Sequence, residues 1–408
     1  QSPIPNPQSP IPNPHYLIFL VLIKFKINKI TSYIKNKNLI IKKMNSLIIY
    51  NILFFLLFAS ANAQSITELY YGSAPIRSMT ILSDGVILGG RSSGHTIEVW
   101  VTSNKGMSWS LRGTVANNVE INYGDIMMLA IPNTNKVFCA FREQNSAGQF
   151  SVTICRSDNN GFDWVYDSTI IGGQSLFVGA PWLFLANNGD LQCYYDSEPL
   201  ASYSGAIGSQ WIAMQGRNGL TGDWTKYGIV EASRDSDTSK LCRDGMASVI
   251  DLGSNRIMVV TEGVEDSPFG GAYANVVRAI QSFDGGKTWD YGGRRIAYQS
   301  FLDGNTQRRY NAYSPMGIRI GGGPVGIVFC TDEDFGGTSD PSDRDVTQRR
   351  THIKFIRTLD NFETWGDKKS FWTGGNQAYA PGMLEESWNE VMVSIDHFNG
   401  NQRILVYK

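Results

Sequence analysis

The sequence predicts an all-β fold, a six-bladed β-propeller of four-stranded antiparallel blades, and three observations support this prediction. A turn signature, Ser/Thr-x-Asx-x-Gly-x-Ser/Thr-Trp, recurs five times at intervals of about 55 to 75 residues. Pairs of apolar strands joined by short Gly, Asn or Asp turns recur six times in step with it. The final copy stops one strand short, while one strand near the N-terminus has no blade of its own.

The turn signature explains how each blade closes a hairpin. The Asx side chain bonds its own backbone, the Gly accepts a positive φ, and the Trp is expected to plug the space between neighbouring sheets. Four copies end at Trp109, Trp164, Trp289 and Trp365, and a degenerate third copy ends at Trp224. The fourth copy, Ser282 to Trp289, matches the signature best.

The strand pairs supply the inner half of each blade. The six pairs are Met79–Gly89, Ile126–Phe141, Trp182–Tyr195, Ala247–Thr261, Met316–Cys330 and Met383–Ile395. The unassigned strand at Ile66 to Tyr71 is predicted to pair with the last blade. This pairing would close the ring and remove exposed sheet edges.

The first 63 residues read as two segments that precede the domain. Residues 1–43 hold a duplicated Gln-Ser-Pro-Ile-Pro-Asn-Pro heptad and then a Lys-, Ile- and Asn-rich stretch, and they are expected to be a non-native or disordered leader. Residues 44–63 contain a short apolar run that ends at Ala61-Asn62-Ala63, which is typical of a secretory signal peptide. The propeller domain is therefore predicted at 64–408, in a secreted, extracellular protein.

Charge and cysteine content limit the possible partners. Seven of the 36 basic residues lie in the leader, so 29 basic residues remain against 37 acidic ones. This acidic balance argues against binding of nucleic acid or an anionic membrane, and a monomer is expected. The five cysteines show no C-x-x-C spacing and lie in apolar runs, so most are predicted to be buried and unpaired. No cofactor and no metal site are predicted.

Polar residues gather at one end of the predicted ring. Antiparallel strands alternate in direction, so the first strands begin and the second strands end at the same end, which we call the mouth. The mouth collects carboxylates, arginines and tyrosines, including Asp125 with Arg142, Asp196 with Glu198, and Arg243-Asp244 with Glu262. Such a concave surface suits a polyol, and paired carboxylates are the working groups of glycoside hydrolysis. The strongest pair is Glu198 and Glu262, although either could be a salt-bridged loop acid.

On these residues the chain resembles glycoside hydrolase family 93, within the sialidase-like propellers whose repeated turns are called Asp-boxes. The resemblance rests on Tyr194-Tyr195-Asp196-Ser197-Glu198, on Arg243-Asp244-Gly245-Met246 and on Thr261-Glu262-Gly263, and it spans the whole predicted domain. It implies a secreted, retaining exo-α-1,5-L-arabinanase that releases arabinobiose from the non-reducing end of arabinan. It also implies that Glu198 and Glu262 are the catalytic carboxylates, with Glu198 as nucleophile and Glu262 as acid/base.

The remaining candidates would bind the sugar. Asp125 and Asp244 could bond sugar hydroxyls or tune the catalytic pKa values, and Arg142 and Arg243 could orient carboxylates. The three tyrosines of the mouth either stack on a furanose ring or simply pack in the core; they are Tyr195, Tyr313 and Tyr379.

Two other functions remain open from the sequence. A sialidase would need three arginines to clamp a substrate carboxylate, and no clear third arginine opens the fifth or sixth blade. A non-catalytic carbohydrate-binding propeller would use the same mouth without turnover. Loss of hydrolysis without loss of sugar binding in a Glu198→Gln variant would separate an enzyme from such a lectin.

Overall fold

The computed structural model describes residues 24, 26, 66–72, 77–265, 274–300, 310–334, 351–360, 362–373, 378–387, 390–397 and 401–407. The chain divides into two compact units, Gln1–Gln64 and Ser65–Lys408. The predicted leader and signal peptide lie outside the described residues, apart from Lys24 and Lys26. No helix within the described ranges is long and apolar enough to cross a membrane.

The second unit is built of four-stranded antiparallel blades, as predicted, and the described strands form six such sheets. Blade 1 contains β2 (Ser78–Ile81), β3 (Ile87–Ser92), β4 (Thr96–Thr102) and β5 (Ser110–Asn117). Blade 2 contains β6 (Ile121–Ala130), β7 (Val137–Asn145), β8 (Phe150–Ser157) and β9 (Val165–Gln174). Blade 3 contains β10 (Val178–Leu185), β11 (Leu191–Ser197), β12 (Trp211–Arg217) and β13 (Val230–Ser233).

The other three blades follow the same order. Blade 4 contains β14 (Gly245–Gly253), β15 (Arg256–Glu265), β16 (Ala274–Ser282) and β17 (Arg295–Tyr298). Blade 5 contains β18 (Ala312–Arg319), β19 (Val325–Thr331), β20 (His352–Asp360) and β21 (Thr364–Trp372). Blade 6 contains β22 (Ala378–Ser387), β23 (Glu390–His397), β24 (Asn401–Tyr407) and the N-terminal strand β1 (Ile66–Gly72).

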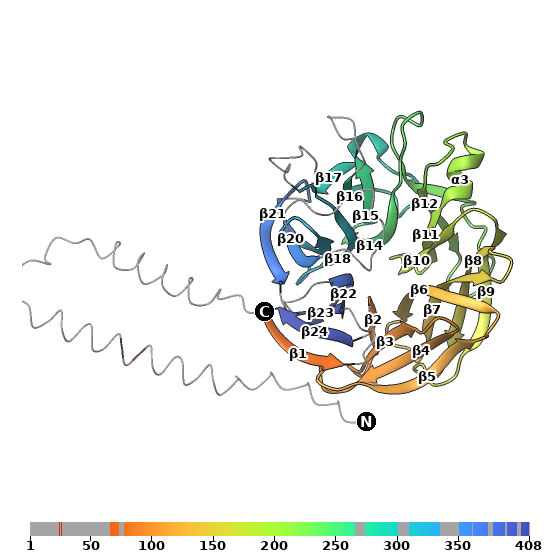
Figure 1. Cartoon of the computed structure of the whole chain (residues 1–408). Coiled ribbons are helices and arrows are strands. Elements are labelled where there is room, and N and C mark those ends of the chain that lie inside the picture. The colour runs from red at the N-terminus through yellow and green to blue at the C-terminus, as the bar shows by residue number, and fades with distance from the viewer. Residues whose placement is uncertain are drawn as a thin grey trace, which may run out of the picture. The chain divides into compact units, whose positions relative to one another are not determined.

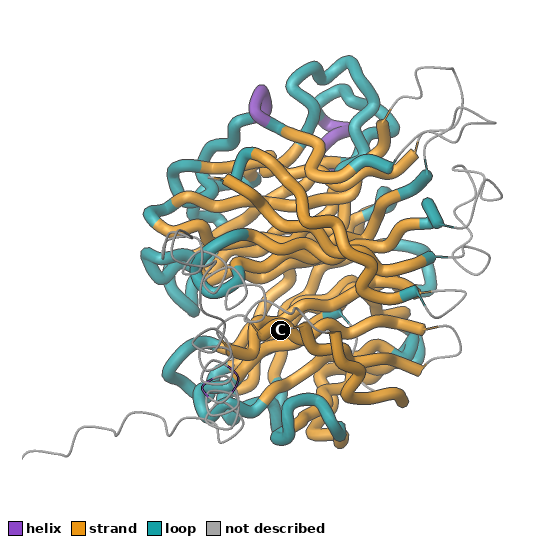
Figure 2. The backbone as a smooth tube through the Cα atoms, turned by 90° about the vertical axis from the view of Figure 1, so that its left-hand side faces the viewer, coloured by secondary structure: helices purple, strands orange, loops and turns teal. Residues whose placement is uncertain are grey.

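The blades surround a common centre, with the first strand of each blade innermost (Figure 1). These first strands contact one another in order around the ring: β2 with β6, β6 with β10, β10 with β14, β14 with β18, β18 with β22, and β22 with β2. Strand β1 pairs antiparallel with β24, as the sequence predicts, with Ile66 opposite Tyr407. Seen from the side, the strands run between two ends at which the loops gather (Figure 2).

Burial follows the position of a strand within its blade. Every residue of the second strands β11 and β19 is buried, because further blades cover both faces of the sheet there. The outermost strand β5 contains only half-buried and exposed residues, because it lies at the outer edge of its blade. The largest apolar cluster runs through blades 2 to 6, and its biggest fully buried side chains include Tyr194, Tyr195 and Phe138.

The signature turns form the predicted hydrogen-bonded hairpins. In the fourth turn, Ser282 Oγ donates to Asp284 Oδ1 over 2.9 Å and accepts from Gly286 N over 2.8 Å. The Asp284 carboxylate also accepts from Thr288 N over 2.9 Å. The first two turns repeat these three bonds at Thr102, Asn104 and Ser108, and at Ser157, Asn159 and Asp163.

The tryptophans of these turns pack against the preceding blade, which confirms their expected role as plugs. Trp289 of blade 4 meets Tyr194 of blade 3 edge to face, with ring centroids 6.0 Å apart. Trp109 of blade 1 shares a cluster with Met392 of blade 6. The repeated turns therefore hold neighbouring blades together at this end of the ring. The loops and strand ends at the opposite end are not needed for these contacts and can form a binding site.

The five cysteines are buried and no disulfide joins them, in line with the prediction made for most of them. The short helix α3 (Glu198–Tyr203) follows β11 and contacts β12. A single 3₁₀ turn, η1 (Tyr291–Gly293), precedes β17. Helix α3 is relevant to the candidate site because its first residue, Glu198, is one of the two predicted catalytic carboxylates.

Candidate active site

The mouth is shaped by a repeated irregularity in the first strands. The pairing of first and second strands shifts register near the mouth in blades 2 to 6, and each shift is a bulge. Non-glycine residues with positive φ lie in four of these bulges and just before β2: Arg77, Asp125, Ala180, Met246 and Ser314. Such backbone conformations are costly for non-glycine residues and cluster at functional sites.

The bulges turn backbone N–H groups toward side chains of the preceding blade. Ser314 N of blade 5 donates to Glu262 Oε2 of blade 4 over 2.6 Å. Met246 N of blade 4 donates to both carboxylate oxygens of Asp196 of blade 3, at 3.0 and 3.2 Å. Ala180 N donates to Asp125 Oδ2 over 3.3 Å. Three carboxylates on consecutive blades are therefore held by the strained backbone of the next blade.

Glycines make room for these side chains. Gly124, Gly179 and Gly245 each precede a positive-φ residue of a bulge. A Cβ at Gly245 would lie 2.6 Å from Gln210 Nε2 and 3.0 Å from Asp196 Oδ2. A Cβ at Gly124 would lie 2.4 Å from Arg142 Nη2. This recurring Gly at one position of the first strand is a sequence signal that could have located the bulges and Asp196.

Glu198 lies beside this row rather than in it. The second strand β11 ends at Ser197, which caps α3 by accepting from Leu200 N, and Pro199 favours the start of a helix. Glu198 therefore begins α3 instead of ending the strand. Its carboxylate accepts from Arg243 Nη2 over 2.9 Å and from Phe177 N over 3.2 Å, and its side chain is 24% exposed.

Glu262 lies within β15 and is also half-buried. Glu198 lies on the preceding blade, at the start of α3. The two are linked through intermediates: Arg243 Nη2 also donates to Gln210 Oε1 over 3.4 Å, and Gln210 Nε2 donates to Asp196 Oδ2 over 3.2 Å. Asp196 in turn interacts electrostatically with Glu262.

Asp125 and Arg142 form the predicted pair at the mouth. Arg142 Nε donates to Asp125 Oδ2 over 3.0 Å, and both side chains keep some exposure. Arg142 therefore orients a carboxylate, as expected, and Asp125 can still reach a ligand.

Asp244 takes a different place from the one expected. Its side chain has no exposed surface, and its carboxylate binds Arg278 Nη1 at 2.7 Å and Arg294 Nη1 at 3.1 Å. The Ser233 hydroxyl also donates to it. A carboxylate enclosed in this way fits a structural role better than the expected bond to a sugar hydroxyl. The other expectation, that Asp244 tunes the catalytic pKa values, stays a prediction.

The tyrosines follow the packing alternative where they are described. Tyr195 is fully buried and its hydroxyl accepts from Gln215 Nε2 over 2.9 Å. Tyr313 is 3% exposed and belongs to the main apolar cluster. Tyr195 and Tyr313 therefore offer no free ring face to a furanose. The backbone of Tyr379 lies in β22 opposite Asp396, but its side chain lies outside the described residues.

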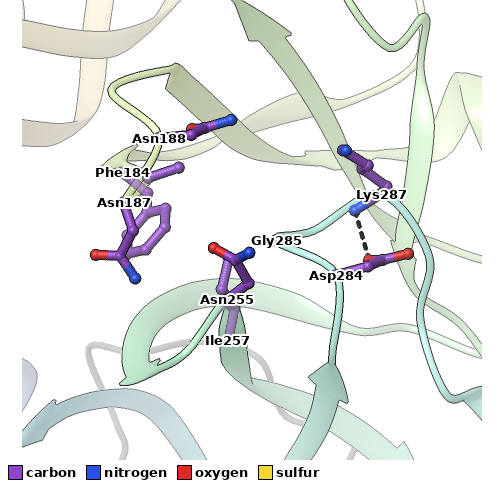
Figure 3. Close-up of a pocket in the computed structure, with 9 residues that line it drawn as sticks. Phe184, Asn187, Asn188, Asn255, Ile257, Asp284, Gly285 and Lys287 are labelled. Carbon is purple, nitrogen blue, oxygen red and sulfur yellow. Dashed lines mark hydrogen bonds between the residues drawn. The ribbon is translucent and has the colours of Figure 1, made fainter.

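A small cavity lies among turns rather than at the mouth (Figure 3). It measures about 60 Å³ and is bordered by the β10–β11 turn, the β14–β15 turn and the fourth signature turn, including Asn188, Asn255 and Asp284. Asn188 bonds Asp190, and Asp284 accepts from Lys287 N within the turn. Because this cavity is small and these polar groups are already bonded to the protein, we place the functional site at the mouth.

Comparisons with known proteins show the fold. No family model matches the sequence, and no curated protein matches it by sequence. The structure resembles the family 93 α-L-arabinofuranosidase of Fusarium graminearum solved with arabinobiose, with 17% identity, a TM-score of 0.58 and coverage of 84% of this chain and 92% of that one. It also resembles the Penicillium chrysogenum α-L-arabinanase solved with arabinobiose, with 16% identity, a TM-score of 0.60 and coverage of 84% and 98%.

A sialidase shares the architecture as well. The Hadza microbial sialidase Hz136 has 14% identity and a TM-score of 0.53, with coverage of 82% of this chain and 65% of that one. At these identities the likeness establishes the fold only. The fold and the mouth together define a β-propeller of four-stranded antiparallel blades with a carboxylate-lined site at one end.

Proposed function

We propose that this chain is a glycoside hydrolase that acts on arabinan, as a secreted, monomeric, retaining exo-α-1,5-L-arabinanase on a six-bladed ring. The observation that carries the proposal is the set of carboxylates at the mouth. Two of them, Glu198 and Glu262, are half-buried, so they are accessible to a substrate while held by protein donors. Neighbours of the same fold solved with arabinobiose support an arabinan-derived substrate.

The surroundings of the two glutamates suit different roles. Glu198 has a cationic neighbour, Arg243, which suits a carboxylate that attacks the anomeric carbon. Glu262 accepts a backbone N–H from Ser314 and interacts electrostatically with Asp196, which suits a group that exchanges a proton with the leaving oxygen. We therefore assign Glu198 as nucleophile and Glu262 as acid/base.

The test is hydrolysis of linear α-1,5-arabinan by residues 64–408, with products identified by mass and chromatography. Arabinobiose is expected from the unsubstituted protein, and Glu198→Gln and Glu262→Gln should each lower kcat by about a thousandfold. Glu363→Gln is the control, because Glu363 is exposed and lies in the fifth signature turn, at the end of the ring opposite the mouth. Full activity in either mouth variant would overturn the assignment.

Azide separates the two roles. In Glu198→Ala, azide can attack the anomeric carbon in place of the nucleophile, so the glycosyl azide should have inverted configuration. In Glu262→Ala, azide should intercept the covalent intermediate and give retained configuration. The opposite pattern would exchange the assignments of Glu198 and Glu262.

One observation keeps a sialidase as the second candidate. The Arg77 guanidinium donates to Met246 Sδ over 3.2 Å and to Ser314 Oγ over 3.4 Å, and no carboxylate among the described residues forms an ion pair with it. It is therefore available for an anionic substrate. Arg142 and Arg243 are already paired with carboxylates, so the described residues show no three-arginine clamp. Cleavage of a sialoside and not of arabinan would favour this alternative.

A further inference from the structure

Asp196 is a buried carboxyl group at the mouth with an unusual set of partners. Asp196 is 3% exposed, and its carboxyl group accepts hydrogen bonds from Met246 N and Gln210 Nε2. No cationic side chain of the described residues lies within 4 Å of it. Burial of an ionised carboxylate without a counter-ion is costly, and such a group normally takes up a proton instead.

The neighbouring negative charges also favour the neutral form of Asp196. Burial raises the pKa of Asp196 well above its usual range, and the charges of Asp125 and Glu262 raise it further. The Met246 N–H and the positive charge of Arg77 oppose this shift and do not outweigh it. Asp125 comes from β6, Glu262 from β15 and Arg77 from the start of β2, so these three are the charged groups that act on Asp196 from the surrounding blades.

We propose that Asp196 is a neutral carboxylic acid at working pH and acts as a positioning residue for Glu262, a role that rests on the proposed function. As a neutral group, it adds no negative charge beside Glu262, so Glu262 can exchange its proton with the leaving oxygen. Through Gln210 and Arg243 it also fixes the position of Glu198. Ionisation of Asp196 at higher pH adds a charge beside Glu262 and ends the active range.

The first test reads the protonation state without any substrate. Infrared spectra of ¹³C-aspartate-labelled protein at pH 6 should contain the carbonyl band of a protonated acid, and this band should be absent from Asp196→Asn. Asp125→Asn is the matched control and should keep the band, because Asp125 is paired with Arg142. Absence of the band from the unsubstituted protein would overturn the proposal, and this spectrum needs no variant to fold.

Thermal unfolding gives a second reading that is independent of activity. A carboxyl whose pKa is higher in the folded than in the unfolded state stabilises the fold below about pH 3.9 and loses that contribution as pH rises toward the folded value. The melting temperature of Asp196→Asn minus that of the unsubstituted protein should therefore rise between pH 4 and pH 7. A difference that stays constant with pH would contradict a neutral Asp196.

The third reading separates a positioning role from a merely structural one. On arabinan, the alkaline limb of kcat/KM should move up by about one pH unit in Asp196→Asn, because the group that ionises there is gone. A uniform loss of activity at all pH values would show that Asp196 only supports the structure. If arabinan is not cleaved at all, the proposed function fails, while the spectra and melting curves still decide the state of Asp196.

Discussion

At the scale of single residues, the acidic side chains of the mouth differ in solvent exposure, and this difference decides which of them can contact a substrate. Glu198, Glu262 and Asp125 keep some accessible surface, whereas Asp196 and Asp244 are buried. The two buried acids differ in turn by their partners. Asp244 forms ion pairs with two arginines, whereas the partners of Asp196 among the described residues are backbone and amide donors.

The buried ion pair of Asp244 depends on the absence of a side chain at Gly263. A Cβ there would lie 1.9 Å from Arg278 Nη1 and 2.7 Å from Asp244 Oδ1. Gly263→Ala should therefore separate the pair and lower the free energy of unfolding by about 3 kcal/mol, measured by urea denaturation. Gly292→Ala is the control, since its added Cβ would lie 3.7 Å from Asp290 Oδ1, an ordinary contact, and it should change stability by less than about 1 kcal/mol. Equal effects of the two substitutions would contradict this account.

At the scale of the element, two irregular pieces of backbone repeat around the ring and serve opposite ends. The bulges present N–H groups to carboxylates at the mouth, at the cost of positive φ in residues such as Met246 and Ser314. The signature turns satisfy their own backbone with one hydroxyl and one Asx side chain. Non-glycine residues with positive φ also occur in the signature turns, at Lys105, Asn160 and Phe362, so such backbone is found at both ends of the ring.

The buried hydroxyl that begins a signature turn should contribute measurably to the free energy of unfolding. Ser282 is fully buried and its Oγ is the acceptor for Gly286 N. Ser282→Ala should leave that N–H without a partner and lower the free energy of unfolding by about 1–3 kcal/mol. Ser110→Ala, at an exposed position of β5, should change it by less than about 0.5 kcal/mol. Thermal or urea denaturation of both variants tests this prediction, which would fail if Ser282→Ala were as stable as Ser110→Ala.

At the scale of the whole molecule, the ring closes by pairing the first strand of the domain with the last. Strand β1 supplies the fourth strand of blade 6, and its partner β24 would otherwise present an unpaired edge. Closure therefore joins residues more than 300 positions apart in sequence, as Ile66 opposite Tyr407 shows.

Removal of β1 should weaken the whole ring rather than one blade. Protein that begins at Gly72 is expected to unfold at a lower temperature and to aggregate more readily than protein that begins at Ser65, because the edge of β24 becomes available to other chains. Melting temperature and light scattering measure both effects. Identical behaviour of the two proteins would show that β1 does not contribute to closure.

The sequence by itself determined the blade architecture, because its information is local and repeated. Alternating apolar strands and the turns ending at Trp109, Trp164 and Trp289 predict four-stranded hairpin units wherever they occur. The same regularity predicted which end of the ring would carry polar groups. In the structure Glu262 and the Asp125–Arg142 pair lie beside the bulges at that end, and their roles toward a substrate stay a prediction.

Only the tertiary structure decided which polar residues of the mouth are available to a ligand. Asp196, Glu198 and Asp244 look alike in sequence, but their burial and partners come from neighbouring blades: Met246 N for Asp196, Arg243 for Glu198, and Arg278 with Arg294 for Asp244. Tyr195 is likewise a candidate for stacking on a sugar ring in the sequence, but in the structure the packed blades bury it fully. The physical reason is that exposure and the charged state of a carboxyl depend on groups distant in sequence, which no local pattern specifies.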